Sequence, residues 1–310
     1  MATTMTPGEG SFLEDLVGAG LLLASGVPGV YGRSEPFEHV LLRFDALVTR
    51  ETAADGAEVV RFPPVLPRQH LETTGYLSSF PQLAGSVFSF DGDEETALDL
   101  ADRASRHEDW SELQAMTEVT LLPAACYPVY PWVAGAGQLP DGGRLVDVCC
   151  YCFRHEPSHD PARMQSFRQR ENVRIGTPEE VAAWHRDWIG RGTEILGSVG
   201  LHTETVVASD PFFGRAGRML SANQREQGLK LELVHPISSD APGAIMSINN
   251  HQDHFGRDFG IETSDGQPAH TSCFGFGLER IALALFRLHG LDTDDWPAEV
   301  TDRLRLDEEA

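Results

Sequence analysis

Two distant segments of the sequence carry arginines in settings suited to phosphate chemistry. The first runs from Phe153-Arg154-His155-Glu156 through a loop to Phe167 and then Arg170-Glu171. The second, Gly275 to Arg280, is a glycine-rich turn that leads into a helix. A fixed guanidinium in a shielded cleft stabilises charge on phosphate oxygens far better than water does. The two segments therefore indicate a site for a reaction at a phosphate.

Cys126, Glu171 and Cys273 form a second set of candidate functional residues. Two thiolates and a carboxylate are competent zinc ligands, and three protein ligands leave a fourth position open for substrate. Cys126 and Cys273 lie far apart and have no CxxC spacing. Free cysteines are more often small buried hydrophobes, so spacing alone leaves both interpretations open.

Two further groups compete as candidate metal sites. Cys150 and Cys152 share a strand face beside Arg154, and we interpret them as residues that pack the sheet. His251, Asp253 and His254 form an H-x-D-H cluster that offers metal ligands. Because the cluster follows Asn249-Asn250, we interpret it as a set of loop-capping and hydrogen-bonding residues, although it would flank the substrate pocket.

The elements that must position these residues do not alternate regularly between strand and helix, which favours an antiparallel sheet in an α+β domain. We expect helices over 12–24, 37–52, 178–196 and 278–288, and strands over 59–65, 145–153 and 230–235. Residues 92–112 are acidic and predict a solvated helix-loop insertion, and the acidic tail 292–310 predicts an exposed segment. Residues 1–10 are expected to be disordered, and residues 11–310 are expected to form a single catalytic domain.

Composition limits the classes of partner and the compartment. The net charge is −23, with 24 basic against 47 acidic residues, which disfavours a large nucleic-acid footprint. Five cysteines in 310 residues do not predict a disulfide framework and fit a reduced, cytoplasmic setting. The apolar run 16–31 follows Glu14 and Asp15 and is broken by glycines and Pro28, so we predict a buried helix and turn rather than a signal or membrane segment.

The two arginine segments, taken together, resemble motifs 2 and 3 of class II aminoacyl-tRNA synthetases, whose antiparallel sheet binds ATP and activates a carboxylate. The short Phe-Arg-x-Glu pattern alone also occurs by chance. The resemblance implies that Arg154 binds the α-phosphate, Glu156 the adenine edge and Arg280 the region of the γ-phosphate, while Phe167 stacks under the adenine. It also makes phosphate contacts plausible for the loop residues His155, His159 and Arg163. Residues 37–65 resemble the dimer-interface motif 1, and residues 71–81 resemble seryl-tRNA synthetase catalytic domains.

The whole set resembles the amino acid:[carrier protein] ligases, truncated relatives of the atypical zinc-dependent seryl-tRNA synthetases. Residues 18–22, 29–34 and 37–38 add to this resemblance. It implies a zinc ion on Cys126, Glu171 and Cys273, use of ATP with Mg²⁺, and a homodimer. It also implies that a small amino acid such as glycine or alanine passes to the phosphopantetheine thiol of a carrier protein. In a chain of this length we expect no tRNA-binding arm and no anticodon domain. The candidate residues for ATP, magnesium and the amino acid are Glu262, Glu232, Ser247 and Asn250.

A carrier protein is usually acidic, so this acidic chain needs a local basic patch to attract one. Residues 211–230 contain Arg215, Arg218, Arg225 and Lys230 against one acid, Glu226. On a helix, the three arginines fall within roughly a quarter of the circumference. We expect this segment to be the carrier-docking helix; the alternative is a solvated arginine-rich helix.

Two rival functions stay open at this level. A short aminoacyl-tRNA synthetase would charge tRNA, and the acidic balance and missing arm count against it. A catalytically silent paralogue would bind an amino acid or adenylate, and it would have no need of Arg154, Glu156, Phe167 and Arg280. The sequence does not specify the amino acid, the carrier protein or the pathway.

Overall fold

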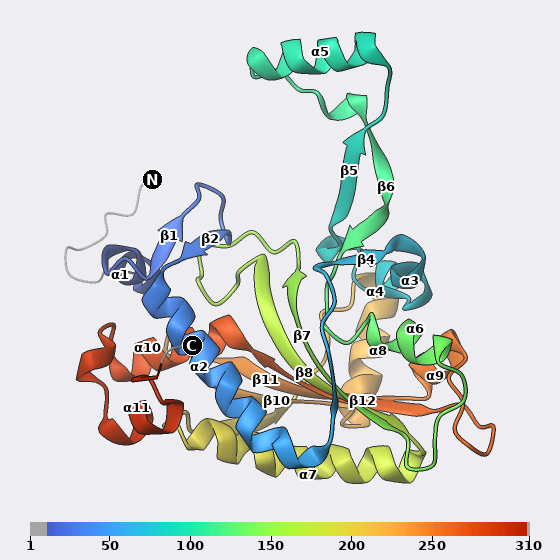
Figure 1. Cartoon of the computed structure of the whole chain (residues 1–310), viewed down its shortest axis with the longest axis vertical. Coiled ribbons are helices and arrows are strands. Elements are labelled where there is room, and N and C mark those ends of the chain that lie inside the picture. The colour runs from blue at the N-terminus through green and yellow to red at the C-terminus, as the bar shows by residue number, and fades with distance from the viewer. Residues whose placement is uncertain (1–10, 309–310) are drawn as a thin grey trace.

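A seven-stranded sheet organises the computed structural model, which describes residues 11–308 (Figure 1). In spatial order its strands are β3 (Glu58–Val60), β7 (Arg144–Phe153), β8 (Ser166–Gly176), β12 (His270–Gly277), β11 (Pro242–Gln252), β10 (Lys230–Pro236) and β9 (Glu204–Val207). All neighbouring strands are antiparallel except β3 and β7, which are parallel at one edge. The predicted α+β fold with an antiparallel sheet is confirmed, apart from this edge pair.

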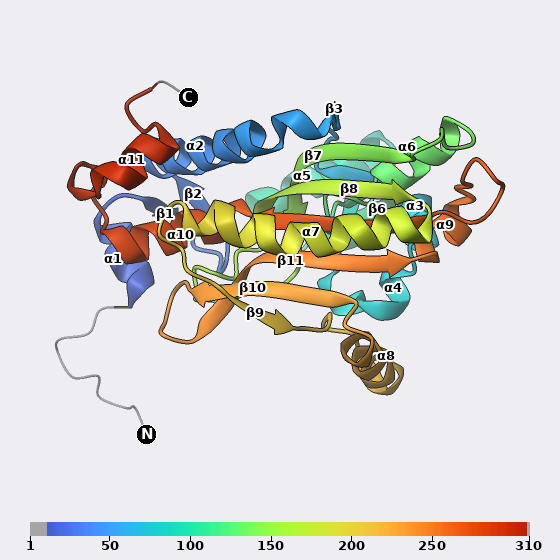
Figure 2. The ribbon, with the colours of Figure 1, turned by 90° about the horizontal axis from the view of Figure 1, so that it is seen from below.

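Long helices cover one face of the sheet, as Figure 2 shows for α7. They are α2 (Glu35–Thr52), α7 (Pro178–Gly197) and α10 (Leu278–His289), and the short α11 (Ala298–Leu304) packs against α2. Alternate residues of β12 enter this layer: the ring centroids of Phe274 and Trp188 lie 3.6 Å apart, and those of Phe276 and Phe44 lie 5.6 Å apart. These contacts explain the apolar spacing that predicted the helix over 37–52.

Short helices cover part of the opposite face. They are α3 (Arg68–Thr73), α4 (Tyr76–Ser79), α6 (Val129–Gly135) and α9 (His254–Phe259). Their buried residues form a second apolar cluster with β7, β8 and β12. A longer helix, α8 (Gly214–Glu226), follows β9, and its existence was expected from the segment 211–230. The face that these short helices cover only in part contains the candidate site.

A projecting arm carries the acidic insertion away from the sheet (Figure 1). The arm begins from a three-stranded sheet with the order β4 (Val65–Pro67), β6 (Gln114–Leu121) and β5 (Ser86–Phe90). Helix α5 (Glu94–Ser105) lies at its tip and has no buried residue. The prediction of a solvated helix over this region is confirmed.

The N-terminal prediction was only partly correct. Helix α1 (Phe12–Gly18) ends early, and Leu22–Ala24 forms strand β1, which pairs with β2 (Tyr31–Arg33). Gly20 has a φ of +72°, a left-handed conformation that interrupts a helix. The prediction that this helix continues to residue 24 is therefore wrong. The expected disorder of residues 1–10 lies outside the described residues.

Two other predicted elements differ from the structure. The strand expected over 59–65 is split into β3 and β4, because the two prolines between them lack the N–H groups that a sheet ladder needs. The tail expected to be exposed contains α11, and Trp296, Val300 and Leu304 are buried.

Four short 3-10 helices are described: η1 (Ala53–Asp55), η2 (Pro81–Leu83), η3 (Ser111–Leu113) and η4 (Thr293–Asp295). In the described part of the chain, no helix is both long and apolar enough to cross a bilayer.

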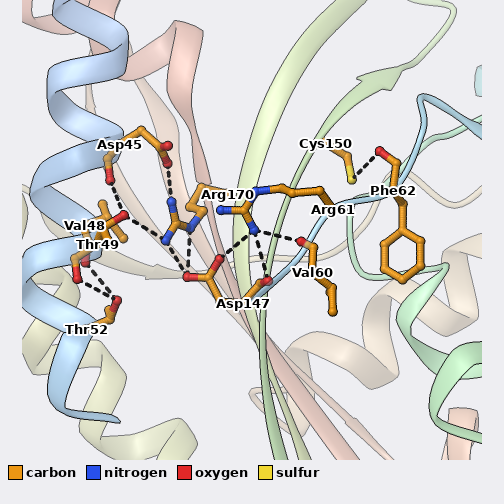
Figure 3. A network of polar contacts seen from close by, with 10 residues as sticks. All are labelled: Asp45, Val48, Thr49, Thr52, Val60, Arg61, Phe62, Asp147, Cys150 and Arg170. Carbon is orange, nitrogen blue, oxygen red and sulfur yellow. Dashed lines mark hydrogen bonds and ion pairs between the residues drawn. The ribbon is translucent and has the colours of Figure 1, made fainter. Parts of the chain in front are cut away.

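A buried ionic network joins α2 to the centre of the sheet (Figure 3). Arg170 of β8 is 2% exposed and donates to Asp147 of β7 and, at 2.6 Å, to Asp45 of α2. It also donates to Thr49, at 3.1 Å. Asp147 additionally accepts from Arg61 at 3.0 Å. The network fixes β7 and β8 against α2 behind the candidate site.

Replacing Asp147 with asparagine should lower the free energy of unfolding by about 3–5 kcal/mol, because it leaves the Arg170 guanidinium buried with an incomplete counter-charge. Urea unfolding followed by circular dichroism measures the change. The matched control is Asp99→Asn, which removes an exposed ion pair with Arg103 on α5 and should cost less than about 1 kcal/mol. Equal losses in the two variants would show that the buried network contributes no more to the free energy of unfolding than an exposed ion pair does.

Candidate active site

A cavity of about 400 Å³ lies on the sheet face opposite the long helices. Strands β8, β10, β11 and β12 contribute its floor, and α8 and α9 contribute residues to its walls. Its lining includes both arginines and all three candidate zinc ligands that the sequence singled out. Its size falls in the range of small-molecule sites.

The alternation of side chains in β8 divides its residues between two tasks. Phe167, Gln169 and Glu171 line the cavity, whereas Arg168 and Arg170 are buried in ion pairs on the other face. Gly275 of β12 lies directly opposite Glu171 in the sheet. A Cβ atom at Gly275 would lie 3.1 Å from Cγ of Glu171, so the absence of a side chain there leaves room for the carboxylate.

The structure brings Cys126, Glu171 and Cys273 together. One ligand atom from each lies within 4.8 Å of the others. Cys126 lies in the loop after β6, and Cys273 lies on β12. Glu171 lies in the middle of β8. The predicted convergence on one pocket is confirmed.

The electrostatics of this cluster fit a bound cation. Burial raises the pKa of Glu171, and a hydrogen bond with Cys126 together with burial raises the pKa of Cys273 well above its usual value. A hydrogen bond with Cys273 favours the Cys126 thiolate, but burial and the Glu171 carboxylate raise the pKa of Cys126 overall. Glu171 Oε2 is buried and accepts no hydrogen bond from any described residue. A divalent cation would give this oxygen a partner and offset the crowded negative charge, so the three residues fit a metal.

The guanidiniums of Arg154 and Arg280 line the same cavity and have no carboxylate partner within 4.0 Å among residues 11–308. Arg154 donates its Nε to the carbonyl of Pro123 at 3.0 Å. Arg280 donates to the carbonyls of Ala162 at 2.8 Å and Ala244 at 3.0 Å. Burial, and then the charge of Arg154, lowers the pKa of Arg280. Two such cations in one cavity are a ready site for a polyanion.

Most of the other residues expected to bind the nucleotide or the amino acid also line the cavity. Phe167 lies under Arg154, whose guanidinium carbon is 5.4 Å from the ring centroid, and Glu156 also lines the cavity. Glu232 and Ser247 are paired across β10 and β11, and both line the cavity with Asn250. These five expected residues therefore line the cavity.

Glu262 is not brought to the cavity. It is exposed and forms an isolated bridge with Pro268, away from the lining residues. The candidate role of Glu262 in binding ATP or magnesium therefore has no support in this arrangement. The loop residues His155, His159 and Arg163 are also exposed and do not line the cavity.

The structure does not assemble either of the two competing metal sites. Cys150 and Cys152 are buried in β7, where Cys150 Sγ lies 3.5 Å from the Phe62 carbonyl, so their packing role is confirmed. Asp253 makes no capping hydrogen bond to α9, and its carboxylate pairs with Arg257. His251 lies on β11 within 3.8 Å of Cys273 Sγ, and burial lowers its pKa to about 3. Within residues 11–308, the Cys126–Glu171–Cys273 group is the one that has metal-ligand geometry.

Comparison with known proteins identifies the family. The chain is 45% identical over 287 residues to amino acid–[acyl-carrier-protein] ligase 1 of Bradyrhizobium diazoefficiens, covering 92% of this chain and 88% of the relative. It is 43% identical over 302 residues to ligase 2 of the same organism, covering 97% and 90%. The chain belongs to the amino acid–[acyl-carrier-protein] ligase family. No family model matches the chain.

More distant matches link this ligase family to the synthetase fold. A type-2 serine–tRNA ligase of Methanopyrus kandleri is 26% identical over 286 residues, which are 84% of this chain and 53% of the relative. A crystal structure of the M. kandleri seryl-tRNA synthetase with A. aeolicus tRNASec superposes with a TM-score of 0.79 at 20% identity, covering 97% of this chain and 62% of that one. Seryl-tRNA synthetase of Pyrococcus horikoshii with ATP gives 0.68 at 14% identity, covering 97% and 64%. These structures establish the class II synthetase fold.

Sequence reasoning missed several residues of the site of this ligase-family chain. Gln169 lies between Phe167 and Glu171 on the same face of β8, and strand alternation was enough to find it. Asp210 had no such signal, because it lies in a loop. Its carboxylate contacts Lys230 at 2.6 Å and Gln224 at 2.8 Å, and so links β10 and α8 at the cavity wall.

Proposed function

We propose that the chain activates a small amino acid with ATP as an aminoacyl-adenylate and passes it to the phosphopantetheine thiol of a carrier protein. The observation that carries this proposal is one cavity that holds a Cys/Glu/Cys cluster beside two arginines, neither of which has a carboxylate partner within residues 11–308. The names of the two Bradyrhizobium ligases support the carrier protein as acceptor. The enzyme is then an AMP-forming ligase that acts in the reduced cytoplasm, with its five cysteines free.

Two arginines and an aromatic ring hold the nucleotide in this proposal. Arg154 binds the α-phosphate and stabilises the charge that grows as the amino-acid carboxylate attacks the phosphorus. Arg280 binds near the γ-phosphate, and Phe167 and Glu156 contact the adenine. No side-chain nucleophile is needed, because the reaction depends on orientation and electrostatics.

Cys126, Glu171 and Cys273 would hold one zinc ion. When bound, zinc supplies an open coordination position for the unprotonated α-amino group of the substrate. Glu232, Ser247 and Asn250 then position the amino acid for attack on ATP, which binds with Mg²⁺. Glycine or alanine is the substrate class that the family resemblance favours.

Residues 11–310 act as a single catalytic domain in this proposal, and the enzyme is a homodimer that uses α2 in its interface. Tyr151, Leu42 and Val59 are exposed apolar side chains in the motif 1 region or on the strand next to it, as a dimer contact requires. The net charge of −23 argues against an extensive nucleic-acid surface.

Amino-acid-dependent ATP–pyrophosphate exchange across the twenty amino acids tests the activation step. We expect exchange with a small amino acid, and no exchange with any amino acid would leave a silent binding protein. Transfer of the labelled amino acid to a holo carrier protein or to tRNA then identifies the acceptor. Charged tRNA with an uncharged carrier would establish the rival synthetase function.

Charge reversal on α8 should separate the two half-reactions. Arg215 and Arg218 are exposed on α8, and Leu220, Asn223 and Gln224 of the same helix line the cavity. The double variant Arg215→Glu/Arg218→Glu should lower kcat/KM for transfer roughly tenfold or more, because it repels an acidic carrier. Exchange should be unchanged.

A charge-matched control comes from the arm. The double variant Arg103→Glu/Arg106→Glu, at the end of α5, adds the same negative charge far along the projecting arm and should leave transfer unchanged. Equal loss of exchange and transfer in the α8 variant would reject α8 as the docking helix.

A further inference from the structure

A histidine and an aspartate form a pair at the cavity wall that the nucleotide and metal chemistry leaves unused. His254 is the first residue of α9 and lines the cavity. Its Nδ1 lies 3.5 Å from Oδ2 of Asp258, one helical turn further on. The two side chains are 52% and 34% exposed, so this pair remains in contact with solvent. Because Nδ1 faces Asp258, the opposite ring nitrogen, Nε2, is the one free for a ligand.

This pair lies close to the end of α8. Gln252, two residues before His254, donates to the side chain of Gln227 directly after α8 at 3.2 Å. The backbone N–H of Asn250 donates to the carbonyl of Leu229 at 2.8 Å. The stretch of wall that carries His254 is therefore joined to the segment after the expected docking helix. An acceptor bound on α8 would have His254 beside its route into the cavity.

The nucleophile of the transfer half-reaction must lose a proton, whereas the nucleophile of the first half-reaction does not. The carboxylate that attacks ATP is already ionised, whereas a thiol is mostly protonated at neutral pH, and the thiolate is the nucleophile. The carboxylates lining the cavity are largely committed: Glu171 to the cysteine cluster, and Asp210 and Glu232 to Lys230. Both ring nitrogens of His251 have partners: Nδ1 contacts Thr271 and Tyr130, and Nε2 contacts Cys273 Sγ.

We propose that His254, oriented by Asp258, is the general base of thiol transfer; this rests on the proposed function. Nε2 takes the proton of the phosphopantetheine thiol, and the sulfur attacks the carbonyl carbon of the aminoacyl-adenylate. The new C–S bond forms as the bond from that carbon to the phosphate oxygen breaks, and AMP leaves. Asp258 holds the ring and stabilises the imidazolium, which then loses its proton to solvent. The remaining charged residue of α9, Arg257, pairs with Asp253, which directly precedes the helix.

His254→Gln should lower the rate of transfer to a holo carrier protein roughly 100-fold and leave ATP–pyrophosphate exchange unchanged. Asp258→Asn should give a smaller loss of the same kind. The matched control is Asp253→Asn, which breaks the other i,i+4 ion pair of α9 outside the cavity and should leave both activities unchanged.

A carrier protein loaded with the selenol analogue of phosphopantetheine distinguishes a base from a structural residue. A selenol is ionised at neutral pH and needs no base, so it should restore transfer by His254→Gln close to the wild-type rate with the same acceptor. It should not restore the Arg215→Glu/Arg218→Glu variant, whose defect is in docking.

Three results would overturn the assignment: undiminished transfer by His254→Gln, a parallel loss of exchange, or no recovery with the selenol carrier. A wild-type chain that shows exchange but charges no carrier would refute the proposed function, and the inference with it. The failure of the inference and the failure of the proposed function are distinguishable. The three results above concern the His254→Gln variant, whereas the last one concerns the wild-type chain.

Discussion

Arg154→Ala should reduce amino-acid-dependent ATP–pyrophosphate exchange by roughly 10²–10³-fold, the usual cost of losing one preorganised donor to a developing charge. Arg154 lines the cavity, donates to the Pro123 carbonyl and has no carboxylate partner among residues 11–308, so no carboxylate competes with a phosphate for its guanidinium. Its removal should therefore affect the reaction much more than the fold. Exchange kinetics with saturating ATP measure the loss in kcat.

Arg154→Lys refines this test, because lysine keeps the charge but lacks the planar fork of donors. We expect an intermediate rate for it. Arg257→Ala is the control: this arginine lies on α9 in an exposed ion pair and does not line the cavity. Exchange by Arg154→Ala at the rate of this control would remove Arg154 from the phosphate site.

Cys273→Ser should abolish stoichiometric zinc binding and, with it, nearly all exchange activity. A serine hydroxyl is a poor zinc ligand compared with a thiolate, and the two remaining ligands are too few to hold the ion. Cys126→Ser should behave in the same way. Metal content of the purified protein, measured by plasma mass spectrometry, gives a readout that is independent of activity.

Cys150→Ser is the matched control, since Cys150 is also buried in the sheet but contacts the Phe62 carbonyl and lies outside the cluster. It should retain the full zinc content. Equal zinc in Cys273→Ser and Cys150→Ser would place the ion elsewhere.

Much of the site could be predicted because strand alternation is local. The two-residue period of β8 assigns Phe167 and Glu171 to one face, and the structure places both in the cavity. The convergence of Cys126 with Cys273 depends on which strands are neighbours, which no local pattern encodes. The family resemblance supplied that pairing. Asp210 was missed because its loop has no period, and its role depends on Lys230 and Gln224.

The errors in the fold have a common physical origin. Acidic composition hid the four-residue spacing of Trp296, Val300 and Leu304, which are buried in the tail. In the N-terminal segment, apolar spacing continued past Gly18, but Gly20 interrupts the helix and Leu22–Ala24 pair with β2 as strand β1, in which only Leu22 is buried. Glu262 was assigned to the site by resemblance alone, and the structure places it at an exposed bridge. Tertiary pairing decided each case.

A crystal structure with a non-hydrolysable glycyl-adenylate analogue, with anomalous data recorded at the zinc edge, tests the account most directly. We predict one anomalous peak bonded to Cys126 Sγ, Glu171, Cys273 Sγ and the amino nitrogen of the analogue, with Arg154 on its phosphate. An analogue bound in the cavity with its amine away from these three side chains, and no zinc peak among them, would contradict the proposed capture of the substrate amine.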